Sequence, residues 1–187
     1  LAKLRALKII SRTSAMRYKQ SEKSLTEIAE ELNESGRKVF LATSTWGRVP
    51  RMYRGRDIYW WLNELGFLDD APEVLPSPAM RFTCNPQLSG KRGGHTLDLR
   101  ALSRSGVALL GHAEGVEGKR NLILAQNLSE NLAFADRFSF ETKKRIDEYI
   151  RRKGIDAPAE QDTEVGAGEP ANAEHIESPS SLDLQEE

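Results

Sequence analysis

The stretch Ser24-Leu-Thr-Glu-Ile-Ala-Glu-Glu-Leu-Asn-Glu-Ser-Gly-Arg-Lys-Val-Phe-Leu-Ala-Thr43 contains the clearest fold signal in the chain. Ser24 and Glu27 have the spacing of a capping box, and apolar residues then recur on one face of a helix. Gly36 is well placed to end that helix. A β-prone run over 38–43 follows directly. The stretch therefore predicts a helix that leads into a buried strand, which is half of a βαβ unit.

Further elements are predicted on both sides of this unit. The helices predicted from apolar spacing cover residues 58–65, 97–105 and 129–153, the last with Ser129 as its cap. The predicted strands cover residues 80–84, 107–111 and 121–125. We expect the last two strands to pair across a turn at 114–119. Residues 2–19 fit a short helix or a strand equally well.

This order of elements predicts an α/β fold with an irregular insertion, which includes a proline-containing connector over 69–80. A divergent basic segment over 1–23 precedes it. Residues 157–187 are acidic and poor in apolar side chains, so we expect an acidic disordered tail there.

The composition limits the classes of protein that this chain can represent. It has 187 residues, of which 39% are hydrophobic and 29% are charged, as in one globular domain with a tail. The single cysteine, Cys84, excludes an intramolecular disulfide and indicates a reducing compartment, so we expect a cytoplasmic protein. No apolar run approaches the roughly 20 residues of a membrane helix, so we expect no membrane span.

Motifs for metal binding or nucleophilic catalysis are absent from the sequence. The histidines share no ligand spacing with one another or with Cys84, and no G-x-S-x-G occurs, so we predict no metal and no catalytic residue. The run Lys91-Arg-Gly-Gly-His95 fits either a phosphate-contacting loop or a tight turn.

Charge is distributed unevenly along the chain. Residues 1–56 have a net charge of +8, residues 57–153 of +1 and residues 154–187 of −10. The two ends are expected either to be solvated and attract one another, or to leave the basic block available for phosphates of a nucleic acid or a cofactor.

Several segments resemble, in the same order, bacterial flavin-containing monooxygenases. More narrowly, they are similar to the branch described as flavoproteins involved in potassium transport. The segments that carry the resemblance are Ile28-Ala-Glu-Glu-Leu32, Gly36-Arg-Lys-Val-Phe-Leu41, Val49-Pro-Arg-Met-Tyr-Arg-Gly-Arg-Asp-Ile-Tyr-Trp-Trp-Leu62, Asn85-Pro-Gln-Leu-Ser-Gly90, Leu97-Asp-Leu-Arg100, Gly106-Val-Ala-Leu-Leu-Gly111 and Asn131-Leu-Ala-Phe-Ala-Asp136.

The resemblance implies that residues 24–156 form a partial Rossmann-like NAD(P)-binding domain. In such enzymes NADPH reduces FAD, and a flavin hydroperoxide then oxygenates a small organic substrate. The FAD fingerprint G-x-G-x-x-G is absent from this chain, so FAD is not expected to bind here. The resemblance thus implies a fragment that is inactive alone and whose partners are the missing parts of the parent flavoprotein.

The sequence departs from the family where the glycine-rich phosphate loop is expected. Only Ser24 of that loop remains, and Glu22 and Leu25 stand in place of glycines. A carboxylate and a bulky side chain both oppose a pyrophosphate at this position.

The arginine-rich loop after the predicted strand over 38–43 resembles the family more closely than the phosphate loop does. Arg48 and Arg51 match positions that would accept the 2′-phosphate of NADPH, and Thr45 stands where another arginine is common. The predicted cofactor-binding residues are therefore Ser24, Thr45, Arg48 and Arg51. NADPH binding is expected to be weak or lost, with any residual preference for NADPH over NADH.

The alternative is a binding module without enzymatic activity. Its basic first third would contact nucleic acid or a protein partner, with which the acidic tail competes. As a binding partner, we expect a small-molecule cofactor rather than nucleic acid.

Overall fold

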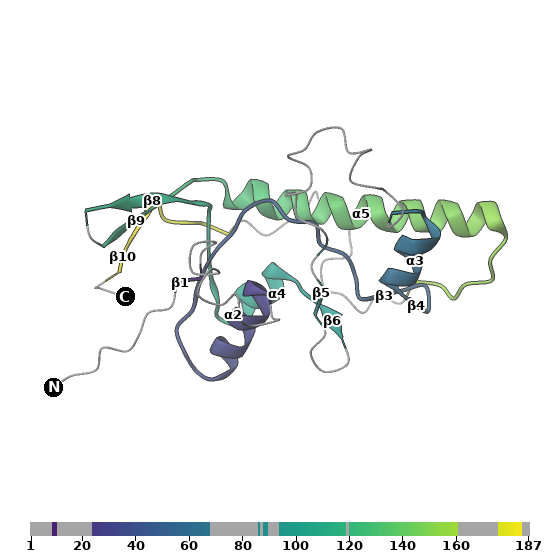
Figure 1. Cartoon of the computed structure of the whole chain (residues 1–187), viewed down its shortest axis with the longest axis horizontal. Coiled ribbons are helices and arrows are strands. Elements are labelled where there is room, and N and C mark those ends of the chain that lie inside the picture. Colours follow the sequence, from purple (N-terminus) through teal and green to yellow (C-terminus); the bar gives the residue numbers. More distant parts are fainter. Residues whose placement is uncertain are drawn as a thin grey trace. The chain divides into compact units, whose positions relative to one another are not determined.

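The computed structural model describes residues 9–10, 24–67, 86, 88–89, 94–118, 120–160 and 176–184. These residues form a mixed α/β structure with several small sheets (Figure 1). The chain divides into two compact units. Unit one comprises residues 1–45, 98–132 and 174–187, and unit two comprises residues 46–97 and 133–173.

Unit one contains a parallel sheet with the strand order β1 (Ile9–Ile10), β2 (Phe40–Ala42) and β7 (Ala108–Leu110). The helix α2 (Leu25–Glu34) lies between β1 and β2 in the sequence, and α4 (Leu99–Arg104) precedes β7. The expected helix and strand of the first stretch are confirmed, and β1 completes a βαβ unit with them.

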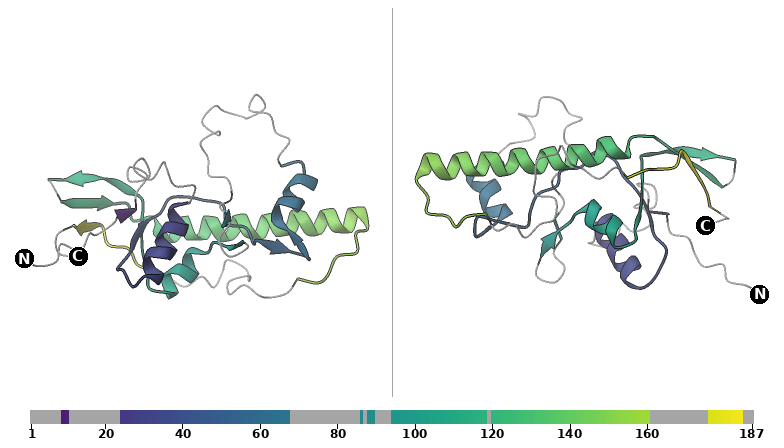
Figure 2. Two further views of the ribbon diagram at one scale, coloured as in Figure 1. Left: turned by 60° about the horizontal axis from the view of Figure 1, so that its bottom comes forward. Right: turned by 180° about the vertical axis from the view of Figure 1, so that it is seen from behind.

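Helices α2 and α4 of unit one lie side by side, as both views in Figure 2 show. The side-chain amide of Asn33, at the end of α2, donates to the backbone oxygen of Ser105 over 3.0 Å. Gly36 ends α2 with a positive φ of 73°, and its amide donates to the carbonyl of Asn33. The bond from Asn33 to Ser105 therefore joins the C-terminal ends of α2 and α4.

A second, antiparallel sheet in unit one has the strand order β10 (Ser181–Asp183), β9 (Asn121–Leu124) and β8 (Ala113–Glu117). The expectation that 121–125 pairs with 107–111 is wrong, because β9 pairs with β8 instead. The residues assigned to a turn at 114–119 continue the strand until Gly118, where a positive φ of 63° reverses the chain.

Strand β10 also corrects the expectation of a wholly disordered tail. Residues 181–183 pair with β9, and Leu182 is buried between the two sheets with Phe40 and Leu110. Apolar and polar residues alternate locally from Ser181 to Leu184, so this short run has an apolar face although the tail as a whole is acidic.

Unit two is built on the hairpin β3 (Met52–Tyr53) and β4 (Arg56–Asp57) and on the helix α3 (Ile58–Glu64). Arg54 and Gly55 both have positive φ, as a two-residue hairpin turn of type I′ requires. A smaller hairpin pairs β5 (Leu88–Ser89) with β6 (His95–Thr96).

The long helix α5 (Leu128–Lys153) begins in unit one and continues in unit two. The cap expected at Ser129 is wrong: the helix begins at Leu128, and the carbonyl of Asn127 accepts from the amide of Asn131. In unit two, Ile146 of α5 packs into a buried core with Trp61, Ile58 and three further residues, Val49, Tyr53 and Leu62.

Some expectations lie outside the described residues. These are the strand over 80–84, the connector over 69–80 and residues 91–93 of the glycine-containing run 91–95. Within the described part of the chain, no helix combines the length and the apolar character needed to cross a membrane.

Candidate functional site

The carboxyl edge of the parallel sheet is the candidate functional site. Helix α2 connects the parallel strands β1 and β2 and contacts β2, so it runs back along the strands and its N-terminus lies where they end. Strand β7 ends at the same edge because it is parallel to β2. In open α/β sheets, ligands bind outside the carboxyl ends of the strands, with phosphates at a helix N-terminus.

The chain's own carboxylate occupies the N-terminus of α2. Glu27 Oε2 accepts from Ser24 N over 2.8 Å and from the Ser24 hydroxyl over 3.0 Å, and Glu27 N donates to Ser24 Oγ over 3.2 Å. These bonds form the predicted capping box, and Glu27 is only 8% exposed. A phosphate placed here would meet the negative charge of Glu27, so Ser24 stabilises the helix rather than an open anion site.

The ends of β2 and β7 are tied together by hydrogen bonds. Thr43 donates both its amide and its hydroxyl to the carbonyl of Leu110, each over 2.9 Å. The side-chain amide of the buried Asn131 donates to the Thr43 carbonyl over 3.2 Å. Thr45, two residues further along, is exposed and lies in unit one together with Ser24.

The residue that follows β7, Gly111, approaches a second backbone very closely. A β carbon at this position would lie 1.8 Å from the carbonyl oxygen of Ala125, and the Gly111 amide donates to Ser178 Oγ over 3.0 Å. The next amide, that of His112, donates to Asn127 Oδ1 over 3.0 Å. Both backbone donors at this strand end are therefore bonded to the chain itself, and neither is left for a ligand.

Arg48 lies in unit two and is buried. Its guanidinium forms an ion pair with Asp136 of α5 over 3.1 Å, and the two side chains are 6% and 14% exposed. Because the charge is neutralised within the fold, this arginine supports the packing of its loop on α5. Its position does not match the exposed guanidinium that a 2′-phosphate requires.

Arg51 is more accessible but is also paired. Its guanidinium lies 2.6 Å from Asp57, the capping residue of α3, and 5.8 Å from the ring centroid of Tyr59. The Arg51 amide donates to Thr96 Oγ1 over 2.8 Å. Of the four predicted binding residues, Arg51 retains the most accessible positive group, although Asp57 competes with any phosphate for it.

A third arginine of this loop belongs to a network on α5. Arg54 Nε lies 2.9 Å from Asp147, which also accepts from the Tyr53 hydroxyl over 3.0 Å. Burial and the hydrogen bond to Asp147 hold the pKa of the Tyr53 phenol far above its ordinary value of 10, and Asp147 raises the pKa of Arg54. The network joins the β3–β4 hairpin to the helix.

Sequence reasoning missed the carboxylates that neutralise this loop. Asp136 and Asp147 are eleven residues apart in one helix, a spacing that brings them to the same face after three turns. That spacing was a usable signal for two partners facing the arginine loop. The pairing of each arginine with a particular aspartate depends on contacts across 88 and 93 residues.

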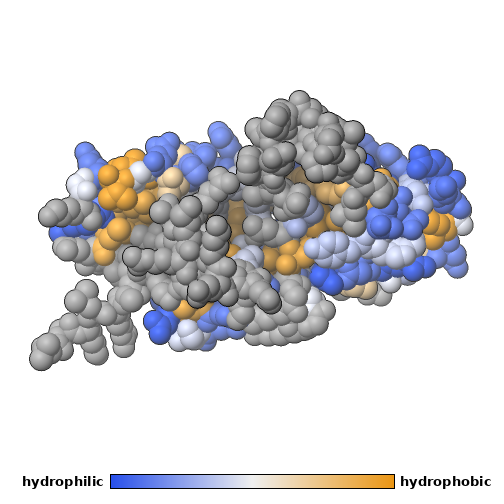
Figure 3. Space-filling view, in the orientation of Figure 1, coloured by the Kyte–Doolittle hydropathy of each residue, from blue (hydrophilic) through white to orange (hydrophobic). Residues whose placement is uncertain are grey.

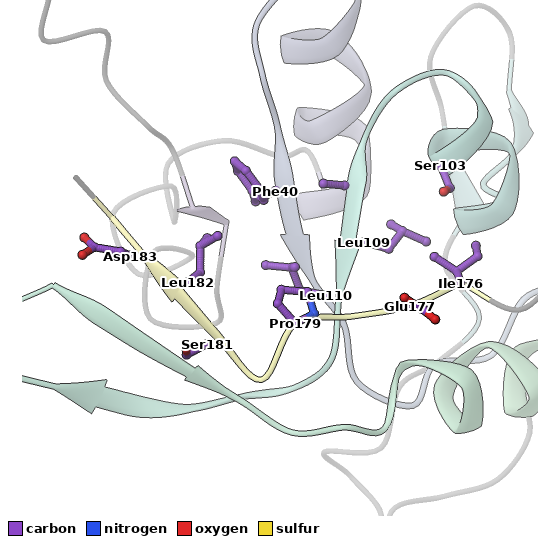
Figure 4. Close-up of a pocket in the computed structure, with 11 residues that line it drawn as sticks. Phe40, Ser103, Leu109, Leu110, Ile176, Glu177, Pro179, Ser181, Leu182 and Asp183 are labelled. Atoms are coloured by element: carbon purple, nitrogen blue, oxygen red, sulfur yellow. The ribbon is translucent and has the colours of Figure 1, made fainter. Parts of the chain in front are cut away.

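A cavity of about 340 Å³ in unit one lies beside the parallel strands β2 and β7 and the segment 176–183 (Figure 4). Phe40, Leu110 and Leu182 contribute apolar lining, and Glu177 and Asp183 contribute carboxylates. Asp183 is paired with Arg120 over 3.1 Å, and the described residues of the lining include no basic side chain that could bind a dinucleotide phosphate. The cavity therefore offers no replacement for the occupied helix terminus.

No group of three or more histidine, cysteine, aspartate or glutamate side chains suited to a metal ion occurs among the described residues. Comparison with known proteins gives no further guide to the site: no family model, no curated protein and no solved structure matches the chain.

Proposed function

We propose that this chain forms the NADPH-domain-like part of a flavin-dependent monooxygenase and holds NADPH weakly or not at all. One observation supports the proposal above others: β1, α2 and β2 form a βαβ unit, and α4 leads to a third parallel strand, β7. The first half of a dinucleotide-binding domain has this order of neighbouring strands. The resembling segments 28–32 and 106–111 fall on α2 and around β7.

The predicted cofactor-binding residues do not fit a firmly bound dinucleotide. In unit one, the carboxylate of Glu27 occupies the N-terminus of α2, and in unit two Arg48 and Arg51 are paired with carboxylates. In the parent enzyme, NADPH and FAD would supply the redox and oxygen chemistry. We expect no oxygenation by this chain alone, and its partners would be the remaining parts of the flavoprotein.

The alternative proposal, a basic module for nucleic acid or a protein partner, has less support. Arg48, Arg51 and Arg54 each face an aspartate in the fold. Only the part of the basic charge that remains unneutralised would contribute to the salt-dependent binding of phosphates. An oligonucleotide affinity that falls steeply with salt, without affinity for NADPH, would favour this alternative.

Calorimetric titration with NADPH and NADH tests the main proposal. The unmodified chain should bind NADPH with a Kd of about 1 mM or weaker, because several backbone contacts and the helix terminus are lost together. A variant with Glu22→Gly, Leu25→Gly and Glu27→Gln should bind NADPH measurably and prefer it to NADH. Adding Arg51→Ala to that variant should remove the preference.

Two outcomes would overturn the proposal. Tight NADPH binding by the unmodified chain would show that Glu27 does not block the site. A restored variant that remains folded by circular dichroism and gains no affinity would show that the sheet edge is not a dinucleotide site. Glu34→Gln, at the other end of α2, is the matched charge control.

A further inference from the structure

A groove between α3 and α5 in unit two takes no part in the proposed function. It encloses about 300 Å³. Leu62, Leu65 and Phe67 line one side, and α5 lines the other with residues at helical spacing: Phe134, Arg137, Phe138, Glu141, Thr142 and Arg145. One continuous face of α5 therefore forms a wall of the groove.

Most of the groove surface is apolar. The rings of Phe134 and Phe138 lie 6.3 Å apart, and Phe134 remains 37% exposed. The Thr142 hydroxyl donates to the carbonyl of Phe138 over 2.8 Å, so its hydrogen-bonding capacity is used by the helix. Apolar patches are visible among hydrophilic side chains over the region of α3 and α5 (Figure 3).

The charged side chains of the groove are predominantly basic. Arg137 and Arg145 contribute two guanidiniums, and Glu141 between them contributes one carboxylate, so the lining has a net charge of +1. An apolar cavity with a few convergent polar groups is the usual form of a small-molecule site, and guanidinium recognises carboxylate by paired hydrogen bonds. This combination favours a ligand with one apolar end and one anionic end.

We propose that this groove binds a small amphiphilic carboxylate. The apolar part lies along Phe134, Phe138 and Leu65, and the carboxylate meets one guanidinium, that of Arg137 or of Arg145, because these two residues are eight positions apart on α5, about 12 Å along its axis. The volume is at the lower end of the range of about 300–1,000 Å³ for ligand pockets, so a medium-chain fatty acid or an aryl-alkyl carboxylate fits better than a dinucleotide. The assignment does not depend on the sheet edge of unit one.

The test is calorimetric titration of the full chain with decanoate and, separately, with decyltrimethylammonium. We expect saturable decanoate binding that is at least tenfold tighter than binding of the cation. Arg137→Gln combined with Arg145→Gln should weaken decanoate binding by about tenfold to a hundredfold, as loss of charge-assisted hydrogen bonds does. Phe134→Gln, at a half-exposed position, should weaken it as well.

The matched control is Arg151→Gln combined with Arg152→Gln, which removes the same charge from the same helix outside the groove. This control should bind decanoate like the unmodified chain. The proposal is overturned if the unmodified chain shows no saturable decanoate binding, if the cation binds equally well, or if the groove and control variants lose the same affinity. Thermal unfolding of each variant confirms that it is folded.

Discussion

The ion pair between Arg48 and Asp136 should contribute to stability rather than to ligand binding. The two side chains are 6% and 14% exposed and lie 3.1 Å apart. Removing one partner breaks this ion pair inside the fold, and breaking a buried pair costs about 3–5 kcal/mol. Because Asp136 keeps some contact with water, we expect about 3 kcal/mol for Arg48→Met and for Asp136→Leu.

The combined variant separates an ion pair from two independent losses. Each single variant already loses the contact between the two side chains, so the loss in the combined variant should be smaller than the sum of the single losses by about 1.5–3 kcal/mol. Urea unfolding, followed by fluorescence, measures each free energy of unfolding. Arg37→Met, at an exposed position, should change it by less than about 0.5 kcal/mol.

A stabilising role of this ion pair is refuted if the losses in free energy of unfolding of the two single variants add in the combined variant, or if Arg48→Met leaves the free energy of unfolding unchanged. The second result would be typical of a binding residue held in place at the expense of stability. Arg48 would then return to the set of residues that contact a phosphate.

Three further predictions concern stability. Gly111→Ala should destabilise unit one by about 3 kcal/mol or more, because the added β carbon would collide with a carbonyl oxygen. Gly115→Ala is the control, since a β carbon there meets no atom within 4 Å and should be tolerated. Thermal unfolding compares the stability of the two variants. Leu182→Ala should lower the free energy of unfolding by about 2–3 kcal/mol, because it leaves a cavity between the sheets, whereas Ser181→Ala at an exposed position should change it little. Equal losses of stability in urea unfolding would contradict the docking of β10. The pKa of the Tyr53 phenol is raised in the folded state, so its contribution to stability is complete below pH 10 and is lost as the pH rises further, by up to about 1.4 kcal/mol per pH unit. The Tyr53→Phe variant should therefore show a shallower decline in the free energy of unfolding between pH 10 and 11.5. Parallel declines in the two proteins would contradict the assignment.

Local signals in the sequence predicted the elements of the parallel sheet. The capping box at Ser24, the glycine that ends α2 and the apolar run before Thr43 all act within a few residues. The secondary structure of this stretch therefore follows from hydrogen bonding and side-chain spacing that the sequence displays directly.

Pairing between distant segments was not predictable in the same way. Strand β9 has alternating apolar residues that suit several partners, and the tight turn at Gly118 selects β8. Strand β10 joins from more than 50 residues away, and its short apolar face was hidden by the acidic composition around it. Segment composition describes an average, whereas a single side chain such as Leu182 suffices to dock three residues.

At the candidate site, too, local features were predictable from the sequence and contacts between distant residues were not. The sequence singled out the arginine-rich loop, because it is a contiguous run, and the capping box of Ser24 and Glu27, because its spacing is local. It did not reveal that α5 would supply aspartates to Arg48 and Arg54. Capping and ion pairing convert residues that look suited to a cofactor into residues that stabilise the fold.

The most direct test of the central claim is an amide NMR titration with NADPH of the unmodified chain and of the variant with Glu22→Gly, Leu25→Gly and Glu27→Gln. If the carboxylate of Glu27 closes a dinucleotide site at the N-terminus of α2, the amides of Ser24 and residue 27 should not shift in the unmodified chain. In the variant, the same amides should show the largest saturable shifts. Saturable shifts at these amides in the unmodified chain, or shifts in the variant confined to other parts of the fold, would contradict the claim.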